Sequence, residues 1–360
     1  MHLENSVTVY NLSHLDSGLV ADHISSSAGT ADLSTPIKTC QNPQPLPGDL
    51  VVVCVQEVNP AYPMLELSDG TELSLTRGNI IVGALGSRKA LHGFSGRVPS
   101  ELQIGQQLDL LNKGGVIGEC TAFHRDLEWP TKVEYLGTIV QGSGKVNLGD
   151  FALPLVEGPL PKTPLVLVLG TCMNSGKTTV CTRVIEAFAA RGLRVNSGKV
   201  AGVACKQDLL AMRRSGAERV LSFHDFGLAS SSDVDSLVPV TRSLIHHLAT
   251  PDTDFIVLEM GDGILGGYHV STLFTDTELF DRQVCRIVCA NDLMGVWGSL
   301  QWMEQNVHKP DAGPILISGP VTDSGEGVNY IERNWSVPAA NPFDSPGKLC
   351  SFVQKSLQSC

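Results

Sequence analysis

The stretch from Pro164 to Val180 constrains the fold more than any other part of the sequence. The apolar run Leu165-Val-Leu-Val-Leu169 leads into the segment Gly170-Thr-Cys-Met-Asn-Ser-Gly-Lys-Thr-Thr179, and helical periodicity then continues to about Arg191. This order predicts a buried strand, a loop of phosphate size and the first turn of a helix. Backbone N–H groups in such a loop bind anions together with the positive end of the helix dipole.

The segment from Gly170 to Thr179 comes close to the pattern G-x-x-x-x-G-K-[ST] of nucleotide phosphate loops. Lys177 is expected to reach the β- and γ-phosphates, and the Thr178 hydroxyl to bind Mg²⁺. The spacing departs from the pattern because Thr171 occupies the position of the first glycine. An accidental Gly-Lys-Thr is the alternative, but strand, loop and helix occur in the required order. The predicted nucleotide-binding residues of this segment are Gly170, Thr171, Asn174, Ser175, Gly176, Lys177, Thr178 and Thr179.

Composition places the chain among ordinary globular proteins. Apolar residues make up 42% and charged residues 18% of its 360 residues, which suggests two domains with substantial cores. The net charge of −11 argues against a general nucleic-acid surface or an anionic-membrane surface. The first residues do not resemble a signal peptide and no apolar run approaches membrane-spanning length, so we expect a cytoplasmic protein.

We predict four segments along the chain. Residues 1–46, rich in Ser, Asp, Thr and Pro, are interpreted as a partly irregular N-terminal arm, and residues 158–164 as a linker. Residues 47–157 contain many short apolar runs separated by Gly and Pro, which predicts a small β-rich accessory domain, a barrel or a sandwich. Residues 165–360 are predicted to form a P-loop NTPase domain.

The predicted β-rich domain contains few features that indicate chemistry. A hairpin is expected with Asp69-Gly70 at its turn. Residues 83–89 and residues 113–115 combine glycines with basic side chains and could touch phosphate, but solvated turns are the favoured interpretation of both. The sequence assigns no role to this domain.

Beyond the linker, apolar strands alternate with helical segments. This alternation is typical of an α/β domain with a mainly parallel sheet and helices on both faces. In such sheets ligands bind at the carboxyl ends of the strands. The predicted strands span residues 165–169, 194–199, 255–259, 285–290 and 315–318, and the predicted helices about 177–190, 208–216, 234–249, 294–306 and 346–358.

Charged side chains follow two of these strands. Lys199 would lie across the crevice from Lys177, so that two catalytic cations converge on one transferring phosphoryl group. Glu259 ends an apolar strand before a glycine-rich turn, as expected for a carboxylate that holds Mg²⁺. Asp208 opens a helix, either as its N-cap or as a further ligand. The predicted metal ligands are therefore Thr178, Asp208 and Glu259.

Other polar residues after the strands are weaker candidates. Asp225, Asp262 and His269 lie in glycine-containing loops and could contact the substrate. Asn291 follows the strand at 285–290, where its amide could pair with a nucleotide base, although Asn291-Asp292 could equally begin a helix.

The loop resembles that of a known superfamily. Gly170-Thr171 and Gly176-Lys177-Thr178 look like the Gly-Thr-x-x-x-x-Gly-Lys-Thr loop of dethiobiotin synthetases and cobyrinic acid amide synthetases. The resemblance covers roughly residues 163–335 and does not include the β-rich domain. Two departures, Cys172-Met-Asn-Ser175 and Met260-Gly-Asp-Gly263, argue against a dethiobiotin precursor as substrate.

The resemblance implies roles for residues outside the loop. It implies that Lys199 is the substrate-side lysine and that Glu259 is the Mg²⁺ glutamate. Asp208 and Asn291 would correspond to the superfamily's second acidic residue and its base-contacting asparagine. Related P-loop proteins carry a second N-terminal domain, among them a family resembling D-glutamate N-acetyltransferases, so the fold does not fix the reaction.

These observations predict an ATP- and Mg²⁺-dependent ligase or kinase. It would transfer the γ-phosphoryl to a carboxylate or carbamate of a small molecule and give an acyl or carbamoyl phosphate. One alternative is a nucleotide-driven switch or metallochaperone, and another is an acyltransferase that keeps the loop for a phosphate-bearing acyl donor. We expect neither nucleic acid nor membrane as a partner, and we expect a homo-oligomer, a dimer.

Overall fold

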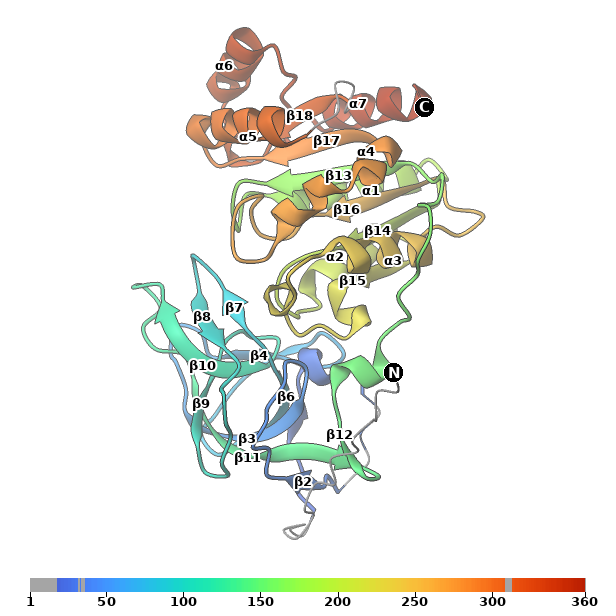
Figure 1. The fold of residues 1–360 in the computed structure, drawn as a ribbon. Coiled ribbons are helices and arrows are strands. Elements are labelled where there is room, and N and C mark those ends of the chain that lie inside the picture. Colours follow the sequence, from blue (N-terminus) through green and yellow to red (C-terminus); the bar gives the residue numbers. More distant parts are fainter. Residues whose placement is uncertain (1–17, 32, 34–35, 308–312, 360) are drawn as a thin grey trace.

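The computed structural model describes residues 18–360 except residue 32, residues 34–35, residues 308–312 and residue 360 (Figure 1). A β-rich half lies at the bottom of Figure 1 and an α/β half at the top. No helix among the described residues is long and apolar enough to cross a membrane.

The α/β half begins after the linker and runs to the last helix. Its strands are β13 (Leu165–Gly170), β14 (Val195–Lys199), β15 (Val220–Ser222), β16 (Phe255–Glu259), β17 (Gln283–Cys289) and β18 (Ile315–Ser318). Its helices are α1 (Lys177–Ala189), α2 (Gln207–Arg214), α3 (Val238–Leu248), α4 (Thr277–Arg282), α5 (Leu293–Asn306), α6 (Gly325–Trp335) and α7 (Pro346–Gln358). Short 3₁₀ helices are η3 (Phe223–Phe226), η4 (Ser231–Asp233), η5 (Val270–Thr275) and η6 (Pro320–Thr322).

The six strands of this half form one parallel sheet in the order β15-β14-β16-β13-β17-β18. Val166 and Val168 of β13 pack with α1, α2 and α7 on one face. Leu165, Leu167 and Leu169 pack with α3, α4, α5 and α6 on the other face. The predicted fold class, a parallel P-loop NTPase sheet between two helical layers, is confirmed.

The structure adds β15, α4 and α6 to the predicted elements. β15 has 3 residues and α4 has 6, so neither is long enough for a period to show. The first turn of α6 contains Gly325 and Gly327, which lower helix propensity. Short or glycine-rich elements of this kind form because they pack against an existing sheet.

The β-rich half consists of short strands and two 3₁₀ turns. The strands are β1 (His23–Ile24), β2 (Thr39–Cys40), β3 (Leu50–Glu57), β4 (Met64–Glu66), β5 (Glu72–Ser74), β6 (Ile80–Leu85), β7 (Arg88–Lys89), β8 (Phe94–Arg97), β9 (Gln107–Leu110), β10 (Val116–Phe123), β11 (Lys132–Gln141) and β12 (Gly144–Lys145). The turns are η1 (Ser26–Ala28) and η2 (Leu148–Phe151). β4 and β5 form the predicted hairpin, with Asp69 and Gly70 between them.

The pairing of the strands makes this half a barrel and not a sandwich. β6, β3, β11, β9 and β10 pair in succession, and the parallel pairing of β10 with β6 closes the ring. Tyr135, Val53 and Ile81 are fully buried in the apolar cluster formed by these strands. Closure removes the exposed strand edges that an open sheet of this size would present.

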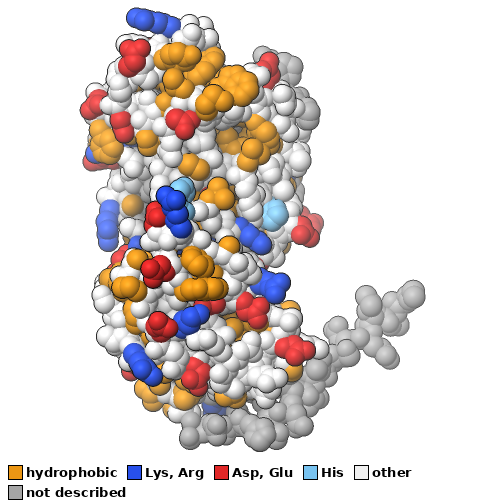
Figure 2. Space-filling model, turned by 90° about the vertical axis from the view of Figure 1, so that its left-hand side faces the viewer, with side chains coloured by type: hydrophobic (Ala, Val, Ile, Leu, Met, Phe, Trp, Pro, Cys, Tyr) orange, Lys and Arg blue, Asp and Glu red, His pale blue; other side chains and the backbone are white. Residues whose placement is uncertain are grey.

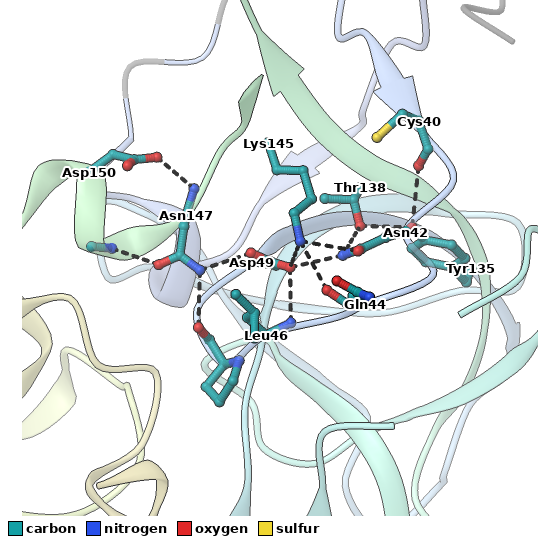
Figure 3. Close-up of polar contacts among 12 residues, drawn as sticks. Cys40, Asn42, Gln44, Leu46, Asp49, Tyr135, Thr138, Lys145, Asn147 and Asp150 are labelled. Carbon is teal, nitrogen blue, oxygen red and sulfur yellow. Dashed lines mark hydrogen bonds and ion pairs between the residues drawn. The ribbon is translucent and has the colours of Figure 1, made fainter. Parts of the chain in front are cut away.

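Described parts of the predicted N-terminal arm join this barrel, since β1 pairs with β6 and β2 pairs with β11. The entry to β3 is fixed by Asp49, whose side chain is almost fully buried (Figure 3). Its Oδ2 accepts hydrogen bonds from Asn42 Nδ2 at 2.8 Å and Lys145 Nζ at 3.0 Å, and its Oδ1 from Asn147 Nδ2 at 2.9 Å. Both oxygens of the buried carboxylate are thereby hydrogen-bonded, as burial of a charge requires.

The predicted linker lies against the α/β half. The Gly158 carbonyl accepts a hydrogen bond from Arg242 Nη2 at 2.8 Å. The Leu160 N–H donates to Glu278 Oε1 at 2.7 Å, and the Leu160 side chain is buried. Arg242 lies on α3 and Glu278 on α4, so the segment is fixed by both helices.

Candidate functional site

The loop between β13 and α1 has a conformation that explains its glycines. Gly176 adopts a φ of 91°, a left-handed value that glycine reaches without strain, directly before α1 begins. A Cβ on Gly170 would lie 2.4 Å from Ser175 Oγ and 2.8 Å from Lys177 Nζ. The loop therefore requires a glycine at the strand end, at position 170, and tolerates Thr171 where the general pattern has its first glycine.

Lys177 lies across this loop and is 5% exposed. Its Nζ donates hydrogen bonds to the Cys172 carbonyl at 2.8 Å and to Ser175 Oγ at 3.4 Å. The ammonium group is thus held above the loop, where the phosphates of a nucleotide would lie.

Thr178 connects the two acidic residues predicted to hold Mg²⁺. Its hydroxyl lies 3.0 Å from Glu259 Oε1 and 3.2 Å from Asp208 Oδ1. Asp208 lies in the first turn of α2, whose N-cap is Lys206, so its carboxylate does not cap the helix. The structure thus brings together all three predicted metal ligands.

Lys199 lies beside this cluster because β14 pairs with β16 and places it opposite Glu259. It forms an ion pair with Asp208. Burial lowers the pKa of Lys199, but the charges of Asp208 and Glu259 outweigh burial and raise it above its ordinary value. In turn, the Lys199 charge lowers the pKa of Asp208. The two carboxylates therefore favour the protonated form of Lys199.

Glu259 is the more deeply buried carboxylate of the pair. Burial and the charge of Asp208 raise its pKa. Its Oε2 is buried and has no hydrogen-bond partner. An unsatisfied carboxylate oxygen in this environment is costly unless a cation or donor occupies the neighbouring space.

These residues fit Mg²⁺ by their chemistry. A hydroxyl and carboxylates are the hard oxygen ligands that Mg²⁺ prefers, and its remaining positions are usually filled by phosphates and water. Among the described residues no group of three or more His, Cys, Asp and Glu side chains is placed to hold a metal by itself. Phosphates of a nucleotide or water would complete the coordination.

The weaker sequence candidates separate into two groups. Asp262 lines the same cleft as the loop. Burial raises the pKa of its carboxyl group, and the charges of Lys177 and Arg88 offset only part of this rise. Asn291 lies beside the loop, where its Nδ2 contacts Cys172 Sγ at 3.2 Å. Asp225 and His269 are not among the residues that line this cleft.

Asp225 and His269 make contacts within their own loops. The Asp225 carboxylate accepts a hydrogen bond from the Ser222 N–H at 2.7 Å and completes a capping box on η3. His269 precedes η5 with a φ of 60°, and its carbonyl accepts a hydrogen bond from Thr272 Oγ1 at 2.7 Å. These contacts give both residues a role in shaping loops.

The loop opens into a cleft of about 470 Å³ whose opposite wall comes from the barrel. This wall was not predicted from the sequence. For residues 83–89 and 113–115, which combine glycines with basic side chains, the sequence favours solvated turns. The structure instead places Arg88 and Lys113 in the cleft. The barrel residues that line it are Tyr62, Arg88, Asn112 and Lys113.

Hydrogen bonds fix the barrel against the α/β half beside the cleft. Asn112 Nδ2 donates to the Ala204 carbonyl at 2.8 Å, and the Lys206 N–H donates to Glu66 Oε1 at 2.6 Å. Lys113 Nζ donates to Gln207 Oε1 at 2.7 Å. Because residues 204–207 precede Asp208, the barrel contacts the segment that positions one of the predicted metal ligands.

The surface of the α/β half also carries an apolar area away from the cleft. Figure 2 shows apolar side chains gathered on the upper part of the molecule, where α5 and α6 lie. Met294, Trp297 and Tyr330 are 70%, 47% and 42% exposed there. The predicted dimer stays a prediction.

No protein-family model matches the sequence, and no curated protein matches it. Similar solved structures include chloroplast FtsY from Physcomitrella patens, with 14% identity over 58% of this chain and 70% of that chain and a TM-score of 0.35. Hydrogenase maturation factor HypB from Archaeoglobus fulgidus has 16% identity over 54% of this chain and 91% of that one, with a TM-score of 0.33. A DUF1611 family protein from Anabaena variabilis has 13% identity over 59% of this chain and 63% of that one, with a TM-score of 0.37.

At these identities and TM-scores the likeness carries no argument about this chain. Its fold class is established by its own sheet order and phosphate loop. None of these three structures is described as a dethiobiotin synthetase, so the resemblance to that superfamily stays a prediction.

Proposed function

We propose that the protein is a Mg²⁺- and ATP-dependent enzyme that transfers the γ-phosphoryl to a small carboxylate or carbamate. The observation that carries the proposal is the contact of the Thr178 hydroxyl with both Asp208 and Glu259 at the floor of the cleft. Lys177 and Lys199 line the same cleft, so a phosphoryl group there would be bounded by two cations.

Each residue has a role that follows from its contacts. Thr178 and Glu259 would hold Mg²⁺, with Asp208 as a further ligand through water or directly. Lys177 would exchange its contact with the Cys172 carbonyl for phosphate oxygens. Lys199, kept protonated by its two acidic neighbours, would stabilise charge on the transferring group. When bound, Mg²⁺ supplies neutralisation of the phosphate charge and orientation of the phosphates.

The cations that line the cleft support a carboxylate or carbamate as the acceptor. An acceptor of this kind is already ionised at neutral pH and attacks without losing a proton. Lys199 has a raised pKa, which disfavours it as a base that would remove a proton. A hydroxyl acceptor would require such a base.

The proposal is tested by measuring ADP release with Mg²⁺ and ATP, alone and with a panel of small carboxylates. We expect at least one carboxylate to stimulate release, and Thr178→Ala to abolish the stimulation. Thr182→Ala is the matched control, because the Thr182 hydroxyl lies on the same helix and bonds to the Thr179 carbonyl and to no other described residue.

The other outcomes of this experiment correspond to different functions. Slow hydrolysis that a protein stimulates and no carboxylate does would favour a nucleotide-driven switch or metallochaperone. Binding of a phosphate-bearing acyl donor without any hydrolysis of ATP would favour an acyltransferase. Either result would overturn the proposed phosphoryl transfer.

A further inference from the structure

Arg88 is a buried cation on the barrel wall of the cleft. It is 5% exposed and lies on β7, and one of its Nη groups donates to the Leu111 carbonyl. Its Nε is buried without a hydrogen-bond partner. Among the described residues no carboxylate forms an ion pair with Arg88, whereas Lys113 on the same wall is paired with Glu72 at 2.6 Å.

Burial of a charge without an opposite charge beside it is expensive, so the burial of Arg88 requires a reason. An unpartnered Nε does not by itself indicate a ligand site. Arg286 is also buried with an unpartnered Nε, and its Nη2 donates to the Gly313 carbonyl. The difference is location: Arg88 lines the cleft and Arg286 does not.

The residues that line the cleft together with Arg88 include a tyrosine, an aspartate and two lysines. Tyr268 is almost fully buried and lines the cleft beside it, and its hydroxyl accepts a hydrogen bond from the Lys89 N–H at 3.2 Å. Asp262 also lines the cleft and is an acidic side chain there. Arg88, Lys177 and Lys199 line this one cleft, with the two lysines on the phosphate side and Arg88 on the barrel side.

We propose that the barrel wall is the acceptor subsite and that Arg88 binds a carboxylate of the acceptor substrate. The role of the bound carboxylate as the acceptor rests on the proposed function, whereas the anion subsite itself does not. One Nη group of Arg88 donates to the Leu111 carbonyl and its Nε is buried, so a carboxylate would be bound through the other Nη group, in a charge-assisted hydrogen bond. The substrate class is a small molecule with one carboxylate for Arg88 and a second ionised group that reaches the phosphate side, such as a short dicarboxylate.

The position of Arg88 is controlled by the α/β half. Ser87, the residue before it, donates its backbone N–H to Asp233 Oδ1 at 3.0 Å. The turn that leads into β7 is thus fixed to η4, and the guanidinium is presented from a fixed backbone. Substrate selection would therefore belong to the barrel, and phosphoryl chemistry to the loop.

The test is binding of malonate, succinate and glutarate to the full chain, measured by calorimetry with Mg²⁺ and a non-hydrolysable ATP analogue already bound. Filling the phosphate loop first prevents the dicarboxylates from binding there. We expect one of the three to bind the wild type, and Arg88→Ala to weaken its binding by about 30- to 100-fold. Arg88→Lys should have an intermediate effect, because lysine keeps the charge but lacks the planar guanidinium group. Arg97→Ala is the matched control, since Arg97 lies on β8 of the same barrel and its side chain is 68% exposed.

Two results would overturn the proposal: no binding of any of the three dicarboxylates, or binding that Arg88→Ala leaves unchanged. Thermal melts of the variants separate loss of the subsite from loss of the fold, and Arg88→Lys provides the comparison if Arg88→Ala does not fold. Arg88-dependent binding without stimulation of ADP release would leave the subsite standing and refute the proposed phosphoryl transfer.

Discussion

The two walls of the cleft differ in how their charges are balanced. On the α/β wall, Lys199 is paired with Asp208, and the Thr178 hydroxyl contacts both Asp208 and Glu259. On the barrel wall, Arg88 is buried and forms no ion pair with any described residue. A wall with paired charges and an excess of carboxylate oxygens suits a ligand that brings its own metal ion, whereas an unpaired cation suits a bare anion.

The difference between the walls allows one cleft to separate nucleotide binding from substrate binding. The loop binds by backbone N–H groups and a helix N-terminus, which recognise any polyphosphate. The barrel wall binds by side chains, which can change without altering the sheet. If the comparison is right, variants of the two walls will have different kinetic consequences.

The largest effect is expected from Lys177→Ala. Lys177 supplies the charge nearest to the loop, so its removal should lower the rate of nucleotide turnover by about 1,000-fold or more. Lys355→Ala, a change of an exposed lysine on α7, is the control. Measurement of ADP release decides the matter, and near-wild-type activity would remove the loop from the proposed mechanism.

Lys199→Ala is expected to have the next largest effect and to separate binding from chemistry. The turnover number should fall by about 100-fold, because one of two cations around the phosphoryl group is lost. The dissociation constant of the ATP analogue should change by less than about threefold, since the loop and Lys177 remain. A variant that loses nucleotide binding and keeps its turnover number would show that Lys199 does not face the acceptor.

Gly114→Ala tests the contact between the two walls. A Cβ at this position would lie 2.0 Å from the Ala204 carbonyl oxygen, so the barrel would have to move away from the segment before Asp208. We expect a loss of about 2 kcal/mol in the free energy of unfolding, measured by denaturant titration. Gly144→Ala is the control, because a Cβ there has nothing within 4 Å. Equal stability of both variants would mean that this contact does not hold the barrel in place.

Asp233→Asn is expected to have the smallest effect, with a sign that depends on pH. Burial raises the pKa of Asp233 to about 6, so the folded state binds this proton more tightly than the unfolded state. The contribution of Asp233 to stability therefore decreases as pH rises from about 4 to about 6, and it remains low above that range. Because Asn carries no charge, the variant should be more stable than the wild type at pH 7.5 by about 1 kcal/mol.

The pH dependence supplies the control for this prediction. Thermal melts at pH 7.5 and below pH 4 should show that the advantage of the Asn side chain fades in acid, where Asp233 is protonated in both states. A less stable variant at pH 7.5 would mean that the two contacts of Asp233 with the Ser87 N–H outweigh the cost of burying its charge.

The sequence by itself determined the strand, loop and helix at 165–189 because the interactions that form this unit are local. Apolar residues in a continuous run, Gly176 at a left-handed φ and the helix that begins at Lys177 lie within one short segment. The strand ends at Lys199 and Glu259 could be predicted as well, since parallel strands end at the same edge of a sheet.

The closed barrel and the second wall of the cleft depend on contacts between distant parts of the chain and are seen only in the tertiary structure. The pairing of β10 with β6 closes the ring, and no local pattern distinguishes that closure from a sandwich. Asn112 and Ala204 are 92 positions apart in the chain and meet through a hydrogen bond beside the cleft. Arg88 follows a glycine-containing turn that looks solvated in sequence but is buried in the structure, because burial depends on contacts with distant residues such as Leu111.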